Sequence, residues 1–322
     1  MRHFKNILYV NEAIVEQESG LERAVSLAEN NTANLTVVDV IPVATAGIGL
    51  APGGPISFEL QAIMESEHLS RLETLVDPFR KRLDIRLDVL VGKTFLEIIR
   101  AVLRDNYDLV IKPAEDLVWI KNLFGSNDMH LLRKCPCPVW LLNRMEKSCY
   151  NSVMAAIDFD PFNPLTSHLN LNLEILQLSS LLALSDGATL HIVHAWDAFA
   201  HSTMMSRAGT SERSLINYAE NERRLHEKGM MILNEELIRL IGDDAYRKLT
   251  LRHHLPRGPA GKAIARMARE LRADVVVMGT IARTGIAGFI IGNTAETILD
   301  QLTCSVLAIK PPDFVTPVKL ND

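Results

Sequence analysis

The sequence contains two copies of one repeat, and this internal duplication restricts the fold more than any other feature. Four landmarks of the first half return in the same order: Asn11 with Asp158, Ala33 with Ala188, Gly92 with Gly258, and Cys137 with Cys304. Their offsets rise from 147 to 155, 166 and 167 residues, so the second copy carries insertions between parallel landmarks, which duplication explains better than chance. We expect two domains, at 1–147 and 148–322, joined in the polar segment 143–151.

Each copy alternates short apolar runs with amphipathic helical patterns. The expected strands are Ile7–Val10, Leu35–Ile41, Leu87–Val91, Leu109–Lys112, Val139–Leu142, Val153–Ile157, Thr189–Ala195, Leu249–Leu255, Val275–Met278 and Val306–Ile309. The expected helices include Ser57–Leu75, Thr94–Asn106, Ser211–Ile241 and Gly261–Leu271. This order predicts an α/β protein with two open, five-stranded, mostly parallel sheets, each covered by helices on both faces. An exposed apolar edge is a liability, so we expect the last strands of the two copies to pair.

Composition narrows the class of protein. The 322 residues are 48% hydrophobic, enough for two substantial cores. The net charge of −5 provides no positive potential that would attract nucleic acid, so broad nucleic-acid binding is disfavoured. Four cysteines are too few for a disulfide scaffold, and the sequence shows neither a signal-peptide pattern nor an uncharged membrane-spanning run. We expect a cytoplasmic protein with no nucleic-acid partner and no membrane span.

A glycine-marked loop follows the apolar run Val275–Met278 and precedes a helical pattern. A helix start offers unpaired N–H donors and the positive end of its dipole, and glycines let the backbone close around a ligand. This pattern favours a phosphate site in the second copy, at the carboxyl edge of the sheet. The alternative, in which the loop only turns the chain and caps the helix, stays open.

The fragments Val275-Val-Val-Met-Gly-Thr-Ile-Ala-Arg-Thr-Gly285, Gly292-Asn-Thr-Ala-Glu296 and Cys304-Ser-Val-Leu-Ala-Ile-Lys-Pro311 resemble the C-terminal signature of the universal stress proteins. The tandem arrangement, over nearly the whole chain, is similar to the UspE type. The resemblance implies two adenine-nucleotide-hydrolase-like domains, with ATP held by G-x2-G-x9-G-[S/T] in the nucleotide-binding branch. It also implies a role in stress endurance and the following nucleotide-binding residues: Ala156, Ile157, Asp158, Val193, Met278, Gly279, Thr280, Ala282, Arg283, Gly292, Asn293 and Thr294.

The loop departs from the family pattern at two places. Ala282 replaces the second glycine and Asn293 replaces the Ser/Thr. An alanine forced to positive φ costs about 1–2 kcal/mol, which weakens ATP binding without excluding it. Asn293-x-x-Glu296 is a capping-box pattern, so we expect Asn293 to cap the helix.

The first copy has diverged further. Pro113-Ala-Glu115-Asp116 stands in line with Gly279-Thr-Ile-Ala282, which places two carboxylates where phosphate needs donors. We expect no ATP in this copy. In the second copy, Asp158 closes the first strand and could hold Mg²⁺ that bridges nucleotide phosphates, or could only cap the next helix.

Several other groups have both a functional and a structural interpretation. Arg283 could contact phosphate or be solvated, and Val193 could lie beside adenine or belong to the core. Cys135-Pro-Cys137 could bind metal with His130, His253 or His254, but its single-residue spacer favours two buried thiols on one face. The apolar segment Leu117–Phe124 could pack, line a cavity or form a contact surface.

No catalytic centre is visible in the sequence. The segment Arg257–Lys262 is too short for a P-loop and is followed by Ala263, and neither G-x-S-x-G nor H-E-x-x-H occurs. Three functions follow: an ATP/Mg-binding regulatory protein, a nucleotide-free module that binds an apolar ligand, protein partner or second copy, and a slow ATPase or adenylyl transferase.

Overall fold

The computed structural model describes residues 4–12, 18–44, 54–115, 126–166, 169–197, 212–280 and 291–320. Ten strands form one sheet in the order β3-β2-β1-β4-β5-β10-β9-β6-β7-β8. In the first copy they are β1 Asn6–Val10, β2 Asn34–Ile41, β3 Ile85–Val91, β4 Leu109–Pro113 and β5 Val139–Leu142. In the second they are β6 Ser152–Ala156, β7 Thr189–Val193, β8 Thr250–His254, β9 Val275–Gly279 and β10 Ser305–Ile309. The expected strands are confirmed, with bounds that shift by at most two residues.

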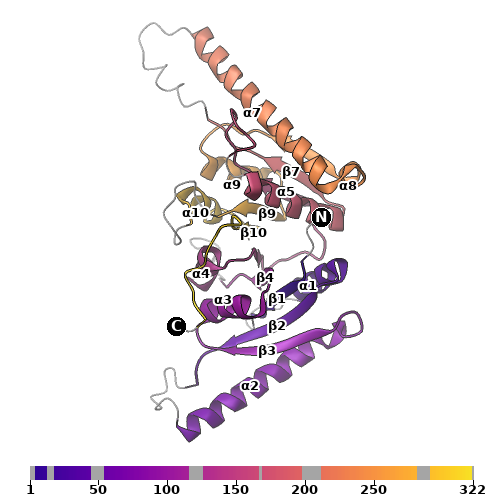
Figure 1. Ribbon diagram of the computed structural model, residues 1–322, viewed down its shortest axis with the longest axis vertical. Helices are drawn as coiled ribbons and strands as arrows, with labels where there is room; N and C mark the ends of the chain where they lie inside the picture. Colours follow the sequence, from indigo (N-terminus) through magenta and orange to yellow (C-terminus); the bar gives the residue numbers. More distant parts are fainter. Residues whose placement is uncertain are drawn as a thin grey trace.

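The two copies meet along their last strands. β5 and β10 pair antiparallel, with Leu307 opposite Trp140, whereas the other ladders between the described strands are parallel. The predicted edge pairing is therefore confirmed, and the two five-stranded sheets become one. Figure 1 shows the first copy below this junction and the second above it.

Helices cover both faces of the sheet, as predicted. They are α1 Glu18–Asn31, α2 Pro55–Val76, a 3-10 turn Asp77–Phe79, α3 Thr94–Asp105, α4 Ser126–Lys134, α5 Leu169–Asp186, α7 Glu212–Ile241, α8 Asp243–Lys248, α9 Ala260–Glu270 and α10 Asn293–Leu299. One apolar core joins one sheet face to α1, α2, α5 and α7, and the other joins the opposite face to α3, α4, α9 and α10. Both cores contain residues of both copies.

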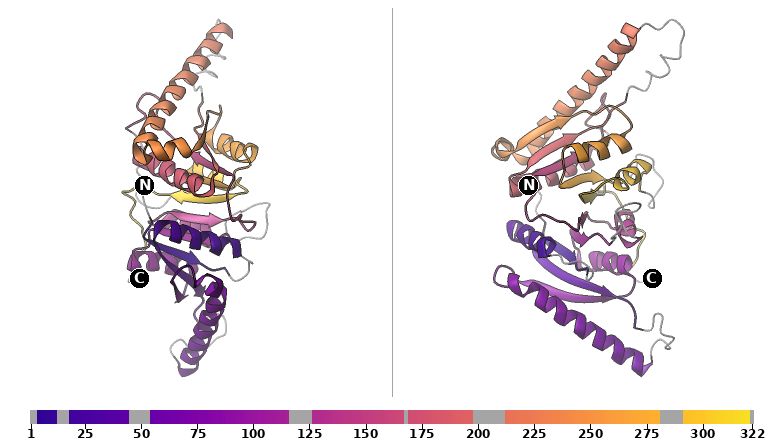
Figure 2. Two further views of the ribbon diagram at one scale, coloured as in Figure 1. Left: turned by 90° about the vertical axis from the view of Figure 1, so that its right-hand side faces the viewer. Right: turned by 180° about the vertical axis from the view of Figure 1, so that it is seen from behind.

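The molecule is elongated, with the two longest helices at its ends. α2 lies beside the edge strand β3, and α7 reaches beyond β8 at the other end (Figures 1 and 2). Gly92 and Gly258, which follow these edge strands, both have positive φ, at 146° and 127°, so their match in the repeat has a conformational reason. Among the described helices, none has the length and apolar character needed to cross a membrane.

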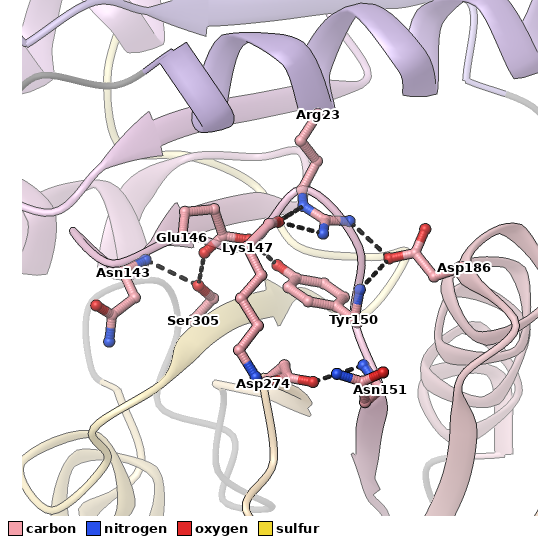
Figure 3. Close-up of polar contacts among 9 residues, drawn as sticks. All are labelled: Arg23, Asn143, Glu146, Lys147, Tyr150, Asn151, Asp186, Asp274 and Ser305. Atoms are coloured by element: carbon pink, nitrogen blue, oxygen red, sulfur yellow. Dashed lines mark hydrogen bonds and ion pairs between the residues drawn. The ribbon is translucent and has the colours of Figure 1, made fainter.

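A buried polar cluster ties the connection between the copies to both of them (Figure 3). The guanidinium of Arg23 on α1 lies 3.1 Å from a carboxylate oxygen of Glu146 and 2.9 Å from one of Asp186 on α5. It also stacks 3.6 Å from the ring centroid of Tyr150. Tyr150 and Ser305 both donate hydrogen bonds to Glu146. α1, the connecting segment, α5 and β10 therefore share one network.

Candidate functional site

A cavity of about 320 Å³ lies in the second copy, at the carboxyl ends of β6 and β9. Ligands of open α/β sheets bind at this edge. Its lining comes from the ends of both strands, from α5, α9 and α10, and from the residues after β7: Ala156, Ile157, Asp158, Leu171, Asn172, Ile175, Ala195, Ala260, Ile264, Met278, Gly279, Gly292, Asn293, Thr294, Ala295 and Ile298. The floor is apolar and the polar groups stand at the strand and helix ends, as in small-molecule sites.

Two contacts with α5 shape one side of the cavity. A Cβ on Gly279 would lie 2.8 Å from Leu171 Cδ2, so the glycine permits the close approach of α5 to β9. The amide of Asn172 donates to the Asp158 carbonyl at 2.7 Å and accepts from the Asp158 N–H at 3.2 Å. These bonds hold the backbone of Asp158 after β6, and its side chain stands exposed at the mouth of the cavity.

The start of α10 differs from the predicted cap. Gly292, with φ −60° and ψ 139°, is the N-cap residue, and Asn293 is already the first helical residue. The cap has no side-chain hydrogen bond, and Glu296 pairs with Arg133 of the first copy at 2.8 Å instead of reaching back to the helix start. The predicted capping box is therefore wrong, because the extended backbone at Gly292 starts the helix one residue earlier.

Eight of the twelve predicted residues line the cavity: Ala156, Ile157, Asp158, Met278, Gly279, Gly292, Asn293 and Thr294. Val193 does not, because its side chain is buried in the core, and Ala195 lines the cavity two residues later. Thr280 is also fully buried and accepts a hydrogen bond from Lys310 at 2.7 Å. Ala282 and Arg283 lie outside the described residues.

Sequence reasoning missed the lining residues of α5 and α9, and also Ala295 and Ile298 of α10. Leu171, Asn172 and Ile175 come from α5, and Ala260 and Ile264 come from α9. Leu171 and Asn172 are four and three residues before Ile175, and Ala260 is four before Ile264, which matches any core-facing stripe. The pattern alone could therefore not separate a cavity wall from ordinary packing.

The strand register corrects one landmark of the repeat. Ile7 in β1 pairs with Leu109, as Val153 in β6 pairs with Val275. Counting five residues on from each, Glu12 and not Asn11 holds the position of Asp158. The first copy therefore keeps a carboxylate at this place, contrary to the expectation from Asn11.

That carboxylate is part of a buried ion cluster. Lys112 Nζ lies 3.0 Å from Glu12, 2.9 Å from Asp128 and 3.6 Å from Glu115, and neither Lys112 nor Asp128 is exposed to solvent. Burial opposes the charge on Lys112, but the three carboxylates outweigh it and raise the pKa of its amine. Burial raises the pKa of Asp128 to about 6, although Lys112 works against this.

The cluster occupies positions that line the cavity in the second copy. Lys112 pairs with Leu141 in β5, as Met278 pairs with Ala308 in β10. Asp128 on α4 corresponds to Ala295 on α10, since Cys135 and Leu302 bond back to Leu131 and Ile298 in the same way. Two small or apolar cavity residues are thus replaced by an ion pair. Of the predicted pair Glu115 and Asp116, Glu115 joins the cluster and Asp116 lies outside the described residues.

Comparison with known proteins agrees with this architecture of two open-sheet α/β domains. The model of the universal stress protein family matches residues 3–143 and again 150–310. The chain therefore belongs to the universal stress protein family, with two family domains in tandem.

Its relatives share the tandem length. The chain is 26% identical to universal stress protein E of Photorhabdus laumondii, over 99% of both chains. It is 30% identical to universal stress protein E of Salmonella typhi, over 72% of this chain and 70% of that one. A crystal structure of a putative universal stress protein from Pseudomonas aeruginosa UCBPP-PA14 superposes with a TM-score of 0.69, at 25% identity, over 96% of this chain and 94% of that chain.

Proposed function

We propose that this chain is a cytoplasmic stress-response protein whose second copy binds an adenine nucleotide as a regulatory ligand. The observation that carries the proposal is the cavity of about 320 Å³ at the carboxyl edge of β6 and β9, which eight of the residues named from the family pattern line. The volume falls within the usual range for small-molecule sites.

The distribution of polar groups supports a ligand with an apolar and an anionic end. Ile157, Ile175 and Met278 offer surface to a flat base. Asn293 and Thr294 begin α10, where backbone N–H groups have no acceptor within the helix and the dipole favours negative charge. These two ends suit a nucleoside phosphate.

Asp158 is the residue that would hold Mg²⁺. Magnesium in nucleotide sites takes one or two carboxylates, with phosphate oxygens and waters completing its shell. The exposed carboxylate of Asp158 stands at the mouth of the cavity, on backbone held by Asn172, and so fits this role. When bound, the ion would neutralise phosphate charge beside that carboxylate.

The test is isothermal titration of the purified full chain with ATP in the presence of MgCl2. We expect saturable micromolar binding of one ATP per chain. The variant Met278→Lys/Ala295→Asp installs in the second copy the ion pair of the first, and we expect it to lose binding. Lys248→Ala, an exposed change away from the cavity, is the matched control.

A second variant separates the roles of metal and fold. Asp158→Ala is expected to weaken ATP binding in magnesium and to change it little in EDTA, with an unaltered melting temperature. Absence of heat with the wild-type chain, or equal binding by the ion-pair variant, contradicts the proposal. Uptake of a hydrophobic probe instead would favour the nucleotide-free module, and turnover that Asp158→Ala abolishes would favour the enzyme.

A further inference from the structure

We propose that Cys135 and Cys137 form a redox-active dithiol, which small hydroperoxides oxidise to an intrachain disulfide. This modification site lies at the junction of the two copies and is independent of the nucleotide cavity. It uses the Cys-Pro-Cys segment between α4 and β5.

The local backbone brings the two sulfurs together. The chain bends at Pro136 and Cys137 before β5 begins at Val139. The bend leaves the two Sγ atoms 3.6 Å apart as free thiols. A disulfide bond is about 2.05 Å long, so the sulfurs need to approach by about 1.5 Å.

A second cavity gives access to the pair. It has a volume of about 630 Å³ and lies between the amino edge of the first copy, at Tyr107 and Asp108, and the end of β10, at Lys310 and Pro311. Cys137 lines this cavity and is 9% exposed, whereas Cys135 behind it is 0% exposed. A small oxidant can therefore reach one sulfur, and the other is shielded from solvent.

The surroundings favour one thiolate in the pair. Burial opposes ionisation of Cys135, but hydrogen bonds from Cys137 and the nearby charge of Lys310 outweigh it and lower the pKa of the Cys135 thiol. The hydrogen bond to Cys135 is the main cause that raises the pKa of Cys137. The cysteine pair thus lies beside a buried lysine, and a nearby cation favours the thiolate form of a thiol.

The duplicated fold supplies an internal comparison. Cys304 corresponds to Cys137, but Leu302 stands where the first copy has Cys135. Burial raises the pKa of Cys304 to about 12, with a further contribution from Asp274. At the same fold position in the second copy, burial therefore keeps the thiol protonated.

The reaction balances with a hydroperoxide as the oxidant. Cys137, the sulfur that the cavity exposes, passes its proton to the Cys135 thiolate and attacks the outer peroxide oxygen. The O–O bond breaks, and the leaving oxygen takes a proton to become water or an alcohol. The second thiol then attacks the sulfenic sulfur, the S–S bond forms and the S–O bond breaks, and a water molecule leaves with the thiol proton. Two electrons pass from the two sulfurs to the peroxide.

The test uses the full chain with Cys149→Ser and Cys304→Ser, so that only the pair remains. It is treated with one equivalent of H2O2 at pH 7 in the presence of a chelator. We expect loss of both thiols, a mass decrease of two hydrogen atoms, recovery with dithiothreitol, and a rate at least tenfold above that of the same chain unfolded in urea. Lys310→Met should slow the folded reaction several-fold while leaving the urea-unfolded rate unchanged.

The comparison variant Cys135→Ser/Cys149→Ser keeps Cys137 and Cys304, and should lose thiols slowly without forming an intrachain bond. Equal rates in the folded and unfolded chain would overturn the proposal. So would a gain of oxygen mass in place of the loss of hydrogen, or a disulfide that appears only between chains.

Discussion

The ammonium of Lys112 and the carboxylate of Asp128 lie 2.9 Å apart, fully buried, at the positions that Met278 and Ala295 hold beside the cavity of the second copy. A pair of charges has therefore replaced two cavity residues in one of two similar folds. The carboxyl edges of the two copies therefore present different side chains, although their sheets are alike.

Removing only one partner of this ion pair should lower the free energy of unfolding strongly. Lys112→Met leaves Glu12, Glu115 and Asp128 without their shared cation, and we expect a loss of about 3–5 kcal/mol in the free energy of unfolding. Lys112→Met/Asp128→Ala, which copies the second copy, should regain about 1–3 kcal/mol of that loss. Urea unfolding curves measure both, and strictly additive losses would contradict the coupling.

Loss of the buried Arg23 should destabilise the fold far more than loss of a surface arginine that also pairs with two carboxylates. Arg23→Met leaves Glu146 and Asp186, whose side chains are 4% and 11% exposed, with no cation. We expect a loss of about 3 kcal/mol in the free energy of unfolding. The control is Arg82→Met: Arg82 is 37% exposed and pairs with Glu22 and Glu29, so its loss should be at most about 1 kcal/mol. Similar shifts of the unfolding midpoint for both variants would refute this difference.

Replacing Gly229 in α7 with alanine should destabilise the protein, although helix propensity favours alanine. Replacing a mid-helix glycine with alanine ordinarily stabilises by about 1 kcal/mol. Here a Cβ would lie 2.4 Å from the ring of Phe159, which stacks on His194 at 3.8 Å. We therefore expect Gly229→Ala to destabilise by about 1–3 kcal/mol, and Asn221→Ala on the exposed face of α7 to be neutral or stabilising. Thermal unfolding of both decides, and a rise in the Tm of Gly229→Ala would show that the ring moves freely.

Acid should destabilise the fold through His191. Burial lowers its pKa to about 4, with contributions from His254 and Arg252, and its Nδ1 lies 2.9 Å from His254 Nε2. A folded pKa below the unfolded value, about 6.5, gives stability that is present above pH 6.5 and falls as the pH drops toward 4.

The measurement is the free energy of unfolding at several values between pH 4 and 7, for the wild-type chain and for His191→Leu. We expect the wild-type chain to lose about 1–2 kcal/mol more than the variant over this range. Parallel pH profiles would show that His191 binds its proton equally in the folded and unfolded chains.

Much of the architecture follows from local pattern. The ten strands, the helices that cover them, and the pairing of Val139–Leu142 with Val306–Ile309 were predicted from periodicity and from the exposed apolar edge. The cavity residues on strand ends and at the start of α10 were predicted, because strand ends and the glycine loop follow one another in a fixed order in the family pattern. Val193 is buried two residues before Ala195, which lines the cavity on the same face of the sheet, and periodicity alone does not fix how far along the strand the cavity begins.

The sequence by itself determined the duplication, the order of the elements and the edge of the sheet at which the cavity lies. These features follow from the spacing of apolar residues and glycines, which acts over a few residues. Only the tertiary structure decided that an ion pair of the first copy occupies positions that line a cavity in the second. Lys112 and Asp128 are sixteen residues apart in the sequence, on a strand and a helix. The sequence alone does not predict that packing brings their charges to 2.9 Å. Burial then makes such a pair necessary, because a charge without solvent needs a partner within contact distance.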